Sequence, residues 1–192
     1  MSSGWRRFPA APRFAPIAGL LIGAAGAIVF WISTQMWPAS IGVVLAMLIM
    51  TVLAGRNAMA EFGTVGVIFA LLAKYNALMA LSGASLPYRL PANTALGLIM
   101  MAALAASRAL AISVRPVAHV ELALALSLGF APALLLGLPG LIGLAAAIAA
   151  LLLVMTASRL SRMRRAVENL RIIEEITEIC FYLGALAAWA YI

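Results

Sequence analysis

Acidic and basic residues recur at helical spacing just before the last apolar stretch of the chain. Glu168, Arg171, Glu175 and Glu178 are three or four positions apart, so a helix would place their side chains along one face. Carboxylate oxygens bind hard cations and guanidinium groups bind phosphate, which makes this face a candidate for metal and phosphate chemistry. The alternative is a surface helix stabilised by i,i+4 ion pairs such as Arg171 with Glu175.

Two nearby features are further candidates for binding phosphate. Arg159, Arg162, Arg164 and Arg165 form a cluster, and arginine matches phosphate geometry. Membrane topology and anionic lipid headgroups explain the same cluster without a ligand. The string Gly63-Thr64-Val65-Gly66 could bring backbone amides to a phosphate at a helix start, although two glycines at this spacing also serve helix packing.

The other residues that could do chemistry are isolated. Lys74 lies inside an apolar stretch, where a charge is a candidate functional group. It is about 11 Å from the nearer end of that stretch by the helical rise, so we expect its amine to extend to the membrane surface. His119 has no second histidine or cysteine with which to bind a metal, and we expect a solvated loop residue. Cys180 is the only cysteine, which excludes an intramolecular disulfide.

The composition indicates which solvent surrounds the elements that position these residues. The chain has 192 residues, of which 66% are hydrophobic and 10% are charged, whereas a soluble domain has about a quarter charged residues. A water-soluble globule is therefore excluded, and we expect one integral membrane domain over residues 1–192, in contact with the lipid bilayer. Arginines that hold loops in the cytoplasm explain the net charge of +7, so no nucleic-acid partner is expected.

Seven stretches are apolar enough to be membrane spans, since roughly 17 to 25 residues cross the hydrocarbon layer. The expected fold is therefore an all-α polytopic transmembrane bundle of about seven spans. The fifth and sixth are short and separated only by Gly137-Leu138-Pro139-Gly140, which favours a tight hairpin over one long kinked helix or a re-entrant pair. The expected spans are Phe14–Ile32, Pro38–Ala54, Phe62–Leu81, Thr94–Val114, Val120–Leu136, Leu141–Thr156 and Ile176–Ile192.

Basic residues predict the orientation of these spans. With the N-terminus in the cytoplasm, the inner segments and their helix ends hold eleven arginines, and the outer loops hold Arg89 alone. Two polar connections, residues 55–61 and 157–175, then lie on the same cytoplasmic face. Six spans instead of seven would change the pattern only at the last helix.

Four strings stand out in order along the chain: FAPIAGLLIGAAGAIVFW (14–31), WPASIGVVLAMLIMTVLAG (37–55), EFGTVGVIFALLAKY (61–75) and ITEICFYLGALA (176–187). Together they resemble the cobalamin synthase family, the adenosylcobinamide-GDP ribazoletransferases of the bacterial inner membrane. The likeness covers about residues 14–82 and 164–188. The middle spans match in hydropathy and in the pair Ser107-Arg108.

The resemblance implies a reaction and a set of site residues. The family joins α-ribazole, or its 5′-phosphate, to adenosylcobinamide-GDP with release of GMP and with Mg²⁺ as cofactor, the last step of nucleotide-loop assembly in cobalamin biosynthesis. Corrinoid and nucleotide substrates are the implied partners. By this comparison Glu168 and Glu175 are the catalytic candidates, and Glu61 joins them as a metal ligand. The implied substrate-binding residues are Arg56, Gly63, Thr64, Gly66, Arg164 and Arg165.

The chain also departs from the family pattern. The family has an acidic Asp-Gly-x-x-Asp string after the second span, where this chain passes directly from Gly55 to Arg56, and the sequence contains no aspartate. Glutamate is one methylene longer, so a magnesium site built for aspartate would not accept it unchanged. Two alternatives follow: a transferase of impaired activity, or a catalytically inactive relative with a binding or structural role in the membrane. A small transporter has less support, because the spans hold few polar groups and show no inverted repeat.

A stripe of small residues marks the first expected span. Gly19, Gly23 and Gly26 are three or four positions apart, and such stripes in membrane helices allow two helices to approach closely. We expect this stripe to be used in packing. The same feature permits close association of two copies of the chain, so a homo-oligomer is compatible with the sequence.

Overall fold

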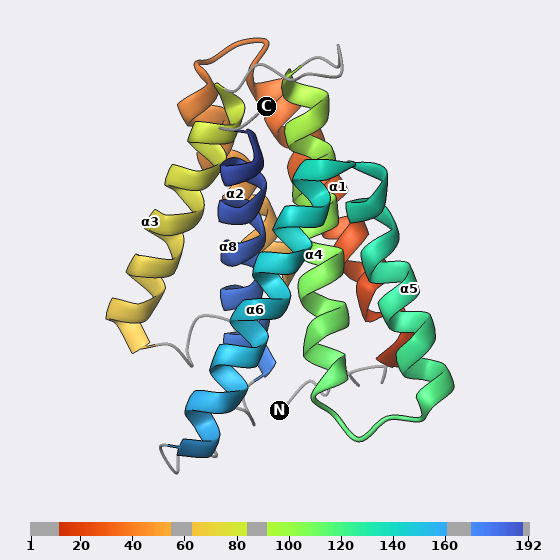
Figure 1. The fold of residues 1–192 in the computed structure, drawn as a ribbon. Helices are drawn as coiled ribbons and strands as arrows, with labels where there is room; N and C mark the ends of the chain where they lie inside the picture. Colours follow the sequence, from red (N-terminus) through yellow and green to blue (C-terminus); the bar gives the residue numbers. More distant parts are fainter. Residues whose placement is uncertain (1–11, 55–62, 84–91, 161–169, 190–192) are drawn as a thin grey trace, which may run out of the picture.

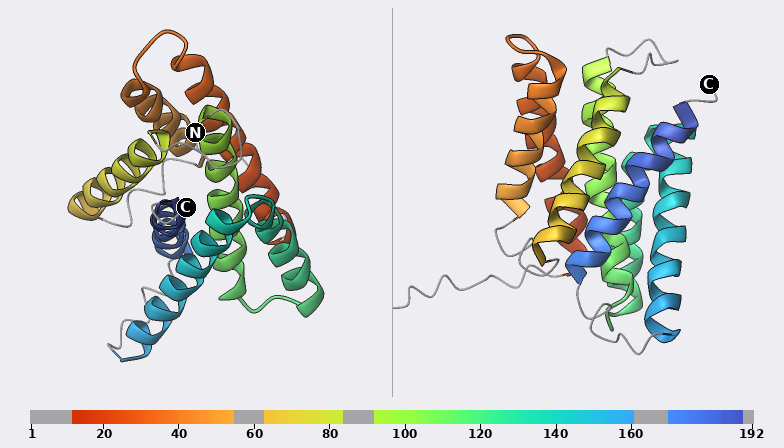
Figure 2. Two further views of the ribbon diagram at one scale, coloured as in Figure 1. Left: turned by 45° about the horizontal axis from the view of Figure 1, so that its top comes forward. Right: turned by 90° about the vertical axis from the view of Figure 1, so that its left-hand side faces the viewer.

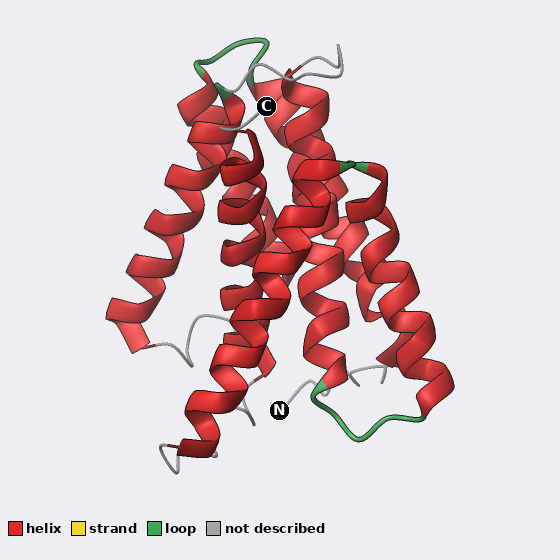
Figure 3. Ribbon diagram, in the orientation of Figure 1, coloured by secondary structure: helices red, strands yellow, loops and turns green. Residues whose placement is uncertain are grey.

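The chain folds into an up-and-down bundle of α-helices in a computed structural model, which describes residues 12–54, 63–83, 92–160 and 170–189 (Figure 1). Figure 3 shows only helices and short turns in these residues, without a strand. The helices are α1 (Ala15–Ser33), preceded by the 3₁₀ turn η1 (Pro12–Phe14), α2 (Ala39–Ala54), α3 (Gly63–Ser82), α4 (Ala92–Ser113), α5 (His119–Leu135), α6 (Leu138–Leu160) and α8 (Leu170–Trp189).

Each of the seven α-helices of the described residues overlaps one of the seven expected stretches, so the all-α prediction is confirmed. Three of them are long and apolar enough to cross a membrane, over Ala15–Ser33, Asn93–Ser113 and Leu138–Ala157. Three more are shorter apolar helices. Hydroxyl groups inside the helices, such as those of Ser113 and Thr156, donate hydrogen bonds to carbonyls of their own helix, which removes the cost of placing them in apolar surroundings.

The polar stretch expected over residues 157–175 is shorter than predicted. Helix α6 continues to Leu160, and α8 already begins at Leu170. Charged residues with long side chains are good helix formers, and Arg171 and Glu174 pair across one turn of α8. Helix α8 therefore starts six residues before the expected last span.

Helix α4 is the centre of the bundle, and Figure 2 shows the other helices arranged around it. Of its apolar window 83% is buried, compared with 28% for α1 and 39% for α6. Alanines of α4 allow neighbouring helices to approach closely, and a Cβ on Gly23 of α1 would lie 2.6 Å from the Cα of Met101. The expected packing role of the glycine stripe is confirmed. Because the stripe is used inside the chain, it gives no support for a homo-oligomer.

The outside of the bundle is apolar. Leu21 and Phe69 are 67% and 68% exposed, and Leu135 and Leu153 are exposed to similar or greater extents. So many large apolar side chains in contact with water would be unfavourable, since each would gain about 1.5–3 kcal/mol from burial. These helices fit a membrane protein, in which lipid covers this surface.

Helices α5 and α6 form the expected hairpin. Leu136 and Gly137 alone separate them, and Gly137 has a φ of 67°, a conformation that favours glycine. Figure 1 shows the chain reversing direction here, so one long kinked helix is excluded. The turn is shorter than expected, because Leu138, Pro139 and Gly140 already belong to α6.

The polar connections attach to one end of the bundle. Figures 1 and 2 show that α2 and α6 end, and α3 and α8 begin, at the end drawn lowest in Figure 1. A hydrogen bond between Arg171 at the start of α8 and the Ala54 carbonyl at the end of α2 links these elements directly. The expectation that the two connections emerge on the same side is thus confirmed for the helix ends that flank them.

Candidate functional site: a polar cavity between α2, α3, α4 and α8

One face of α8 is polar and points into the bundle. Arg171, Glu174, Glu175, Glu178 and Tyr182 follow each other at helical spacing, as the sequence predicts for this segment. Glu178 is only 3% exposed and Tyr182 is fully buried. The surface-helix alternative is therefore wrong, because the charged face of α8 packs against other helices.

Lys74 of α3 is the partner of this face. Its Nζ lies 2.5 Å from Oε2 of Glu175 and 2.7 Å from Oε2 of Glu178. The lysine is 9% exposed, so the expectation that its amine extends to the membrane surface is wrong. Two carboxylates on α8 offer the ammonium a better environment than a headgroup region several ångströms away, since opposite charges attract strongly where water is excluded.

The second oxygen of Glu178 is also occupied. The Tyr182 hydroxyl, one turn further along α8, donates a hydrogen bond to Oε1 of Glu178 at 3.1 Å. Both oxygens of this buried carboxylate thus have partners, which is the condition for burying a charge without a large penalty. We call Lys74, Glu175, Glu178 and Tyr182 the Lys74 network.

Arg171 ties the start of α8 to the end of α2. Its Nη2 donates to the Ala54 carbonyl at 3.0 Å, and its Nη1 lies 3.6 Å from Oε2 of Glu174. The last carbonyls of a helix have no partner within the helix, so the guanidinium satisfies one of them. The i,i+4 pair of Arg171 with Glu175 is not formed, because Glu175 is held by Lys74.

These residues surround a polar cavity with a water-accessible space of about 30 Å³, which is partly open to solvent. Three cations and three carboxylates line it, so its formal charge is zero. Apolar side chains from α2, α3 and α4 complete the wall. The lining residues are Met47, Met50, Thr51, Ala54, Leu71, Lys74, Leu104, Ser107, Arg108, Arg171, Glu174, Glu175 and Glu178.

Arg108 differs from the other two cations of the polar cavity. Lys74 and Arg171 each have a carboxylate within 4 Å, whereas Arg108 forms no hydrogen bond or ion pair with any residue that the structure describes. The neighbouring Ser107 hydroxyl donates to the Leu104 carbonyl of its own helix at 3.2 Å. Arg108 is therefore the cavity cation whose donors are available to a ligand.

Among the predicted site residues that the structure describes, Glu175 is the one that lines the polar cavity. Gly63, Thr64 and Gly66 form the first turn of α3, which confirms a helix start at this string. The other predicted residues, Arg56, Glu61, Arg164, Arg165 and Glu168, lie outside the described residues.

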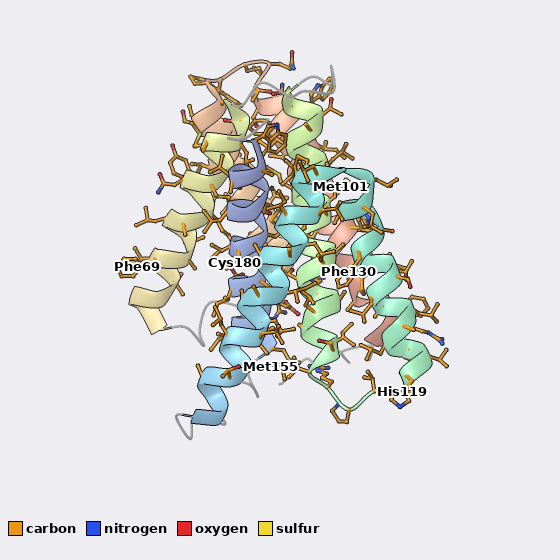
Figure 4. All side chains as sticks on the ribbon, in the orientation of Figure 1. Phe69, Met101, His119, Phe130, Met155 and Cys180 are labelled. Carbon is orange, nitrogen blue, oxygen red and sulfur yellow. The ribbon has the colours of Figure 1, made fainter. Side chains whose placement is uncertain are left out.

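Metal binding has limited support from the described part of the chain. It contains no group of three His, Cys, Asp or Glu side chains arranged to hold an ion. Glu175 and Glu178 already share the Lys74 ammonium. His119 is the first residue of α5 rather than a loop residue, and its side chain is exposed. Figure 4 shows it at the lower end of the bundle, away from Cys180 of α8.

Sequence reasoning missed Arg108 and Tyr182 as site residues, and it named Lys74 and Glu178 as separate candidates without predicting that they pair. A usable signal for that pairing existed. A lysine inside one span and a glutamate inside another are expected to pair, because an isolated charge is costly in the membrane. The signal for Arg108 was its place in the Ser107-Arg108 pair, and Tyr182 gave none.

Comparisons of the whole chain with protein-family models, with curated proteins and with solved structures find no match.

Proposed function

We propose that this chain is a cobalamin-synthase-like membrane transferase whose polar cavity receives the phosphate-bearing part of its substrate. One observation carries the proposal. The strings on which the family resemblance rests lie far apart in the sequence, and residues from each string in the second, third and last spans line the same cavity: Met50 from the second, Lys74 from the third and Glu178 from the last. The Ser107-Arg108 pair lines it too.

The proposed reaction is a displacement at the pyrophosphate of adenosylcobinamide-GDP. A hydroxyl oxygen of α-ribazole forms a bond to the phosphorus on the cobinamide side. The bond between that phosphorus and the bridging oxygen breaks, GMP leaves with the bridging oxygen, and the hydroxyl proton passes to a base. Catalysis of such a transfer depends mainly on positioning and on neutralising charge at the phosphoryl oxygens.

Residues of the polar cavity have chemistry suited to these tasks. Arg108 has free donors, and its planar guanidinium can bind two phosphate oxygens at once. Glu175 is the most exposed carboxylate of the Lys74 network, with 26% of its side chain accessible, and is the candidate base. The carboxylates of the described residues do not form a magnesium site by themselves, so we assign no step to Mg²⁺.

The orientation of the bundle follows from the same proposal. We propose seven spans in the bacterial inner membrane with the N-terminus in the cytoplasm, as the arginine distribution predicts. The end of the bundle that carries the polar cavity then faces the cytoplasm. Nucleotide-linked substrates would reach it from that side without crossing the bilayer.

A second candidate, a catalytically inactive relative that binds ligands or has a structural role, is favoured by a specific observation. Glu175 and Glu178 are both engaged by Lys74, and the sequence contains no aspartate to replace them as metal ligands. A protein of this kind would retain the cavity and bind phosphate-bearing ligands without turnover.

Reconstitution tests the transferase directly. The purified protein in liposomes is given adenosylcobinamide-GDP, α-ribazole and Mg²⁺, and the joined corrinoid and GMP are separated by chromatography. We expect both products in equal amounts, and we expect Glu175→Gln to lower the rate by about a hundredfold or more, as for loss of a general base. Glu121→Gln makes the same change outside the cavity and should keep the wild-type rate. Absence of product from folded wild-type protein would rule out the transferase and leave the inactive relative.

A further inference from the structure

The charge of the polar cavity depends on a single buried lysine. Lys74 and Glu178 are 9% and 3% exposed, so neither charge is well screened by water. The remaining charged groups that face the cavity are Arg108 on α4 and Arg171, Glu174 and Glu175 on α8, while the lining residues of α2 carry no charge. Removing Lys74 alone would leave a cavity of formal charge −1, and removing Glu178 alone would leave +1.

We propose that Lys74 is the counter-ion that allows an anionic ligand into the polar cavity. Without it, Glu175 and Glu178 would direct uncompensated negative charge at a phosphate bound to Arg108. The repulsion between these carboxylates and the phosphate would be strong, because the distances are short and water is largely excluded. Lys74 thus acts on the ligand through the carboxylates that it neutralises, and it needs no contact with the ligand itself.

This role differs from a purely structural one in the sign of its effects. An ion pair that only holds α3 against α8 would be damaged by loss of either partner, and both losses would weaken ligand binding. A counter-ion predicts opposite effects. Loss of Lys74 weakens the binding of an anion, loss of the Glu178 charge strengthens it, and loss of both restores it, because the cavity is again neutral.

The inference rests on the proposed phosphate-binding function of the cavity, but it is tested without turnover. Inorganic pyrophosphate is the probe, and binding is measured by calorimetry on protein in nanodiscs of zwitterionic phosphatidylcholine, which keeps anionic headgroups from competing. The variants are Lys74→Met, Glu178→Gln and the double variant. Glu121→Gln, which removes one negative charge outside the cavity lining, controls for net charge.

We expect Lys74→Met to weaken pyrophosphate binding by about tenfold or more and Glu178→Gln to strengthen it by a similar factor, the size of one partly screened charge at this range. The double variant and Glu121→Gln should bind within about threefold of the wild type. Thermal unfolding of each variant, measured in parallel, separates misfolding from altered affinity.

Two results would overturn the inference. One is weaker binding by Glu178→Gln as well as by Lys74→Met, which would make the network structural only. The other is absence of pyrophosphate binding by the wild type at millimolar concentration. If the expected order of affinities is found but reconstituted protein forms no cobalamin product, the counter-ion role of Lys74 is supported and the proposed transferase activity is contradicted.

Discussion

Lys74 of α3 and Glu178 of α8 are 104 positions apart in the sequence, yet their charged atoms lie 2.7 Å apart inside the bundle. Lys74 is also the only lysine of the chain. A buried ion pair of this kind contributes little when compared with apolar packing of the same volume, but loss of one partner leaves an isolated charge in a medium that cannot solvate it. The first prediction follows from this asymmetry, and the second from the burial of the pair.

Replacing Lys74 by methionine keeps the length of the side chain and removes its charge. We expect the free energy of unfolding in detergent to fall by about 3–5 kcal/mol, because Glu178 is then buried without a counter-ion. Combining Lys74→Met with Glu178→Met should recover most of the loss. A double variant no more stable than Lys74→Met would contradict the ion pair.

Amine-reactive reagents provide an independent view of Lys74. Because a buried, ion-paired ammonium is protected from acylation, we expect a membrane-permeant succinimidyl ester to leave Lys74 of the folded protein unmodified. Removing both carboxylates in Glu175→Gln with Glu178→Gln should make Lys74 reactive. Mass spectrometry of the digested protein measures the modification of Lys74, and rapid modification in the wild type would show that its amine reaches the membrane surface after all.

The contact between α1 and α4 depends on Gly23. Because an added Cβ would lie 2.6 Å from the Cα of Met101, we expect Gly23→Ala to destabilise the protein by about 1–3 kcal/mol through overpacking. Gly83 provides the matched control, since a Cβ there would meet its nearest atom at 3.9 Å. Thermal unfolding of Gly83→Ala should match the wild type, and equal effects of the two substitutions would refute the close approach of α1 to α4.

Labelling of single cysteines tests the proposed orientation. In a Cys180→Ala background, Met36→Cys lies in the connection between α1 and α2, and Ala118→Cys lies in the connection between α4 and α5 at the opposite end of the bundle. With the N-terminus in the cytoplasm, we expect an impermeant maleimide to label position 36 in intact cells and position 118 only after permeabilisation. The reverse pattern would place the polar cavity on the outer face and contradict its proposed access from the cytoplasm.

The helices could be predicted from the sequence because the bilayer leaves few other choices. A long apolar stretch must satisfy its backbone hydrogen bonds internally, so length and hydropathy suffice to find α1 or α4. The hairpin at Gly137 could be predicted for a local reason as well, since glycine and proline mark turns. The limits of α6 and α8 were missed because charged residues extend both helices beyond their apolar parts.

The site could be predicted only in part, because its contacts depend on which helices are neighbours. Helical spacing predicted that Glu175 and Glu178 share a face, but nothing local to α8 reveals that this face meets Lys74. The direction of the Lys74 side chain is decided by the position of α8 against α3, which hydropathy does not encode. The Arg108 guanidinium is free for a similar reason, because Glu174 pairs with Arg171 of its own helix.

The two-residue turn between α5 and α6 has a consequence for how the protein is made. Leu136 and Gly137 are too few to form a separate hydrophilic loop, so one helix cannot insert into a bilayer while the other stays in water. With 17 residues, α5 is short for a span, whereas α6 contains the most apolar window of the three long helices. If both helices span the bilayer, they enter it together as one helical hairpin, in which the more apolar α6 brings the shorter α5 into the hydrocarbon.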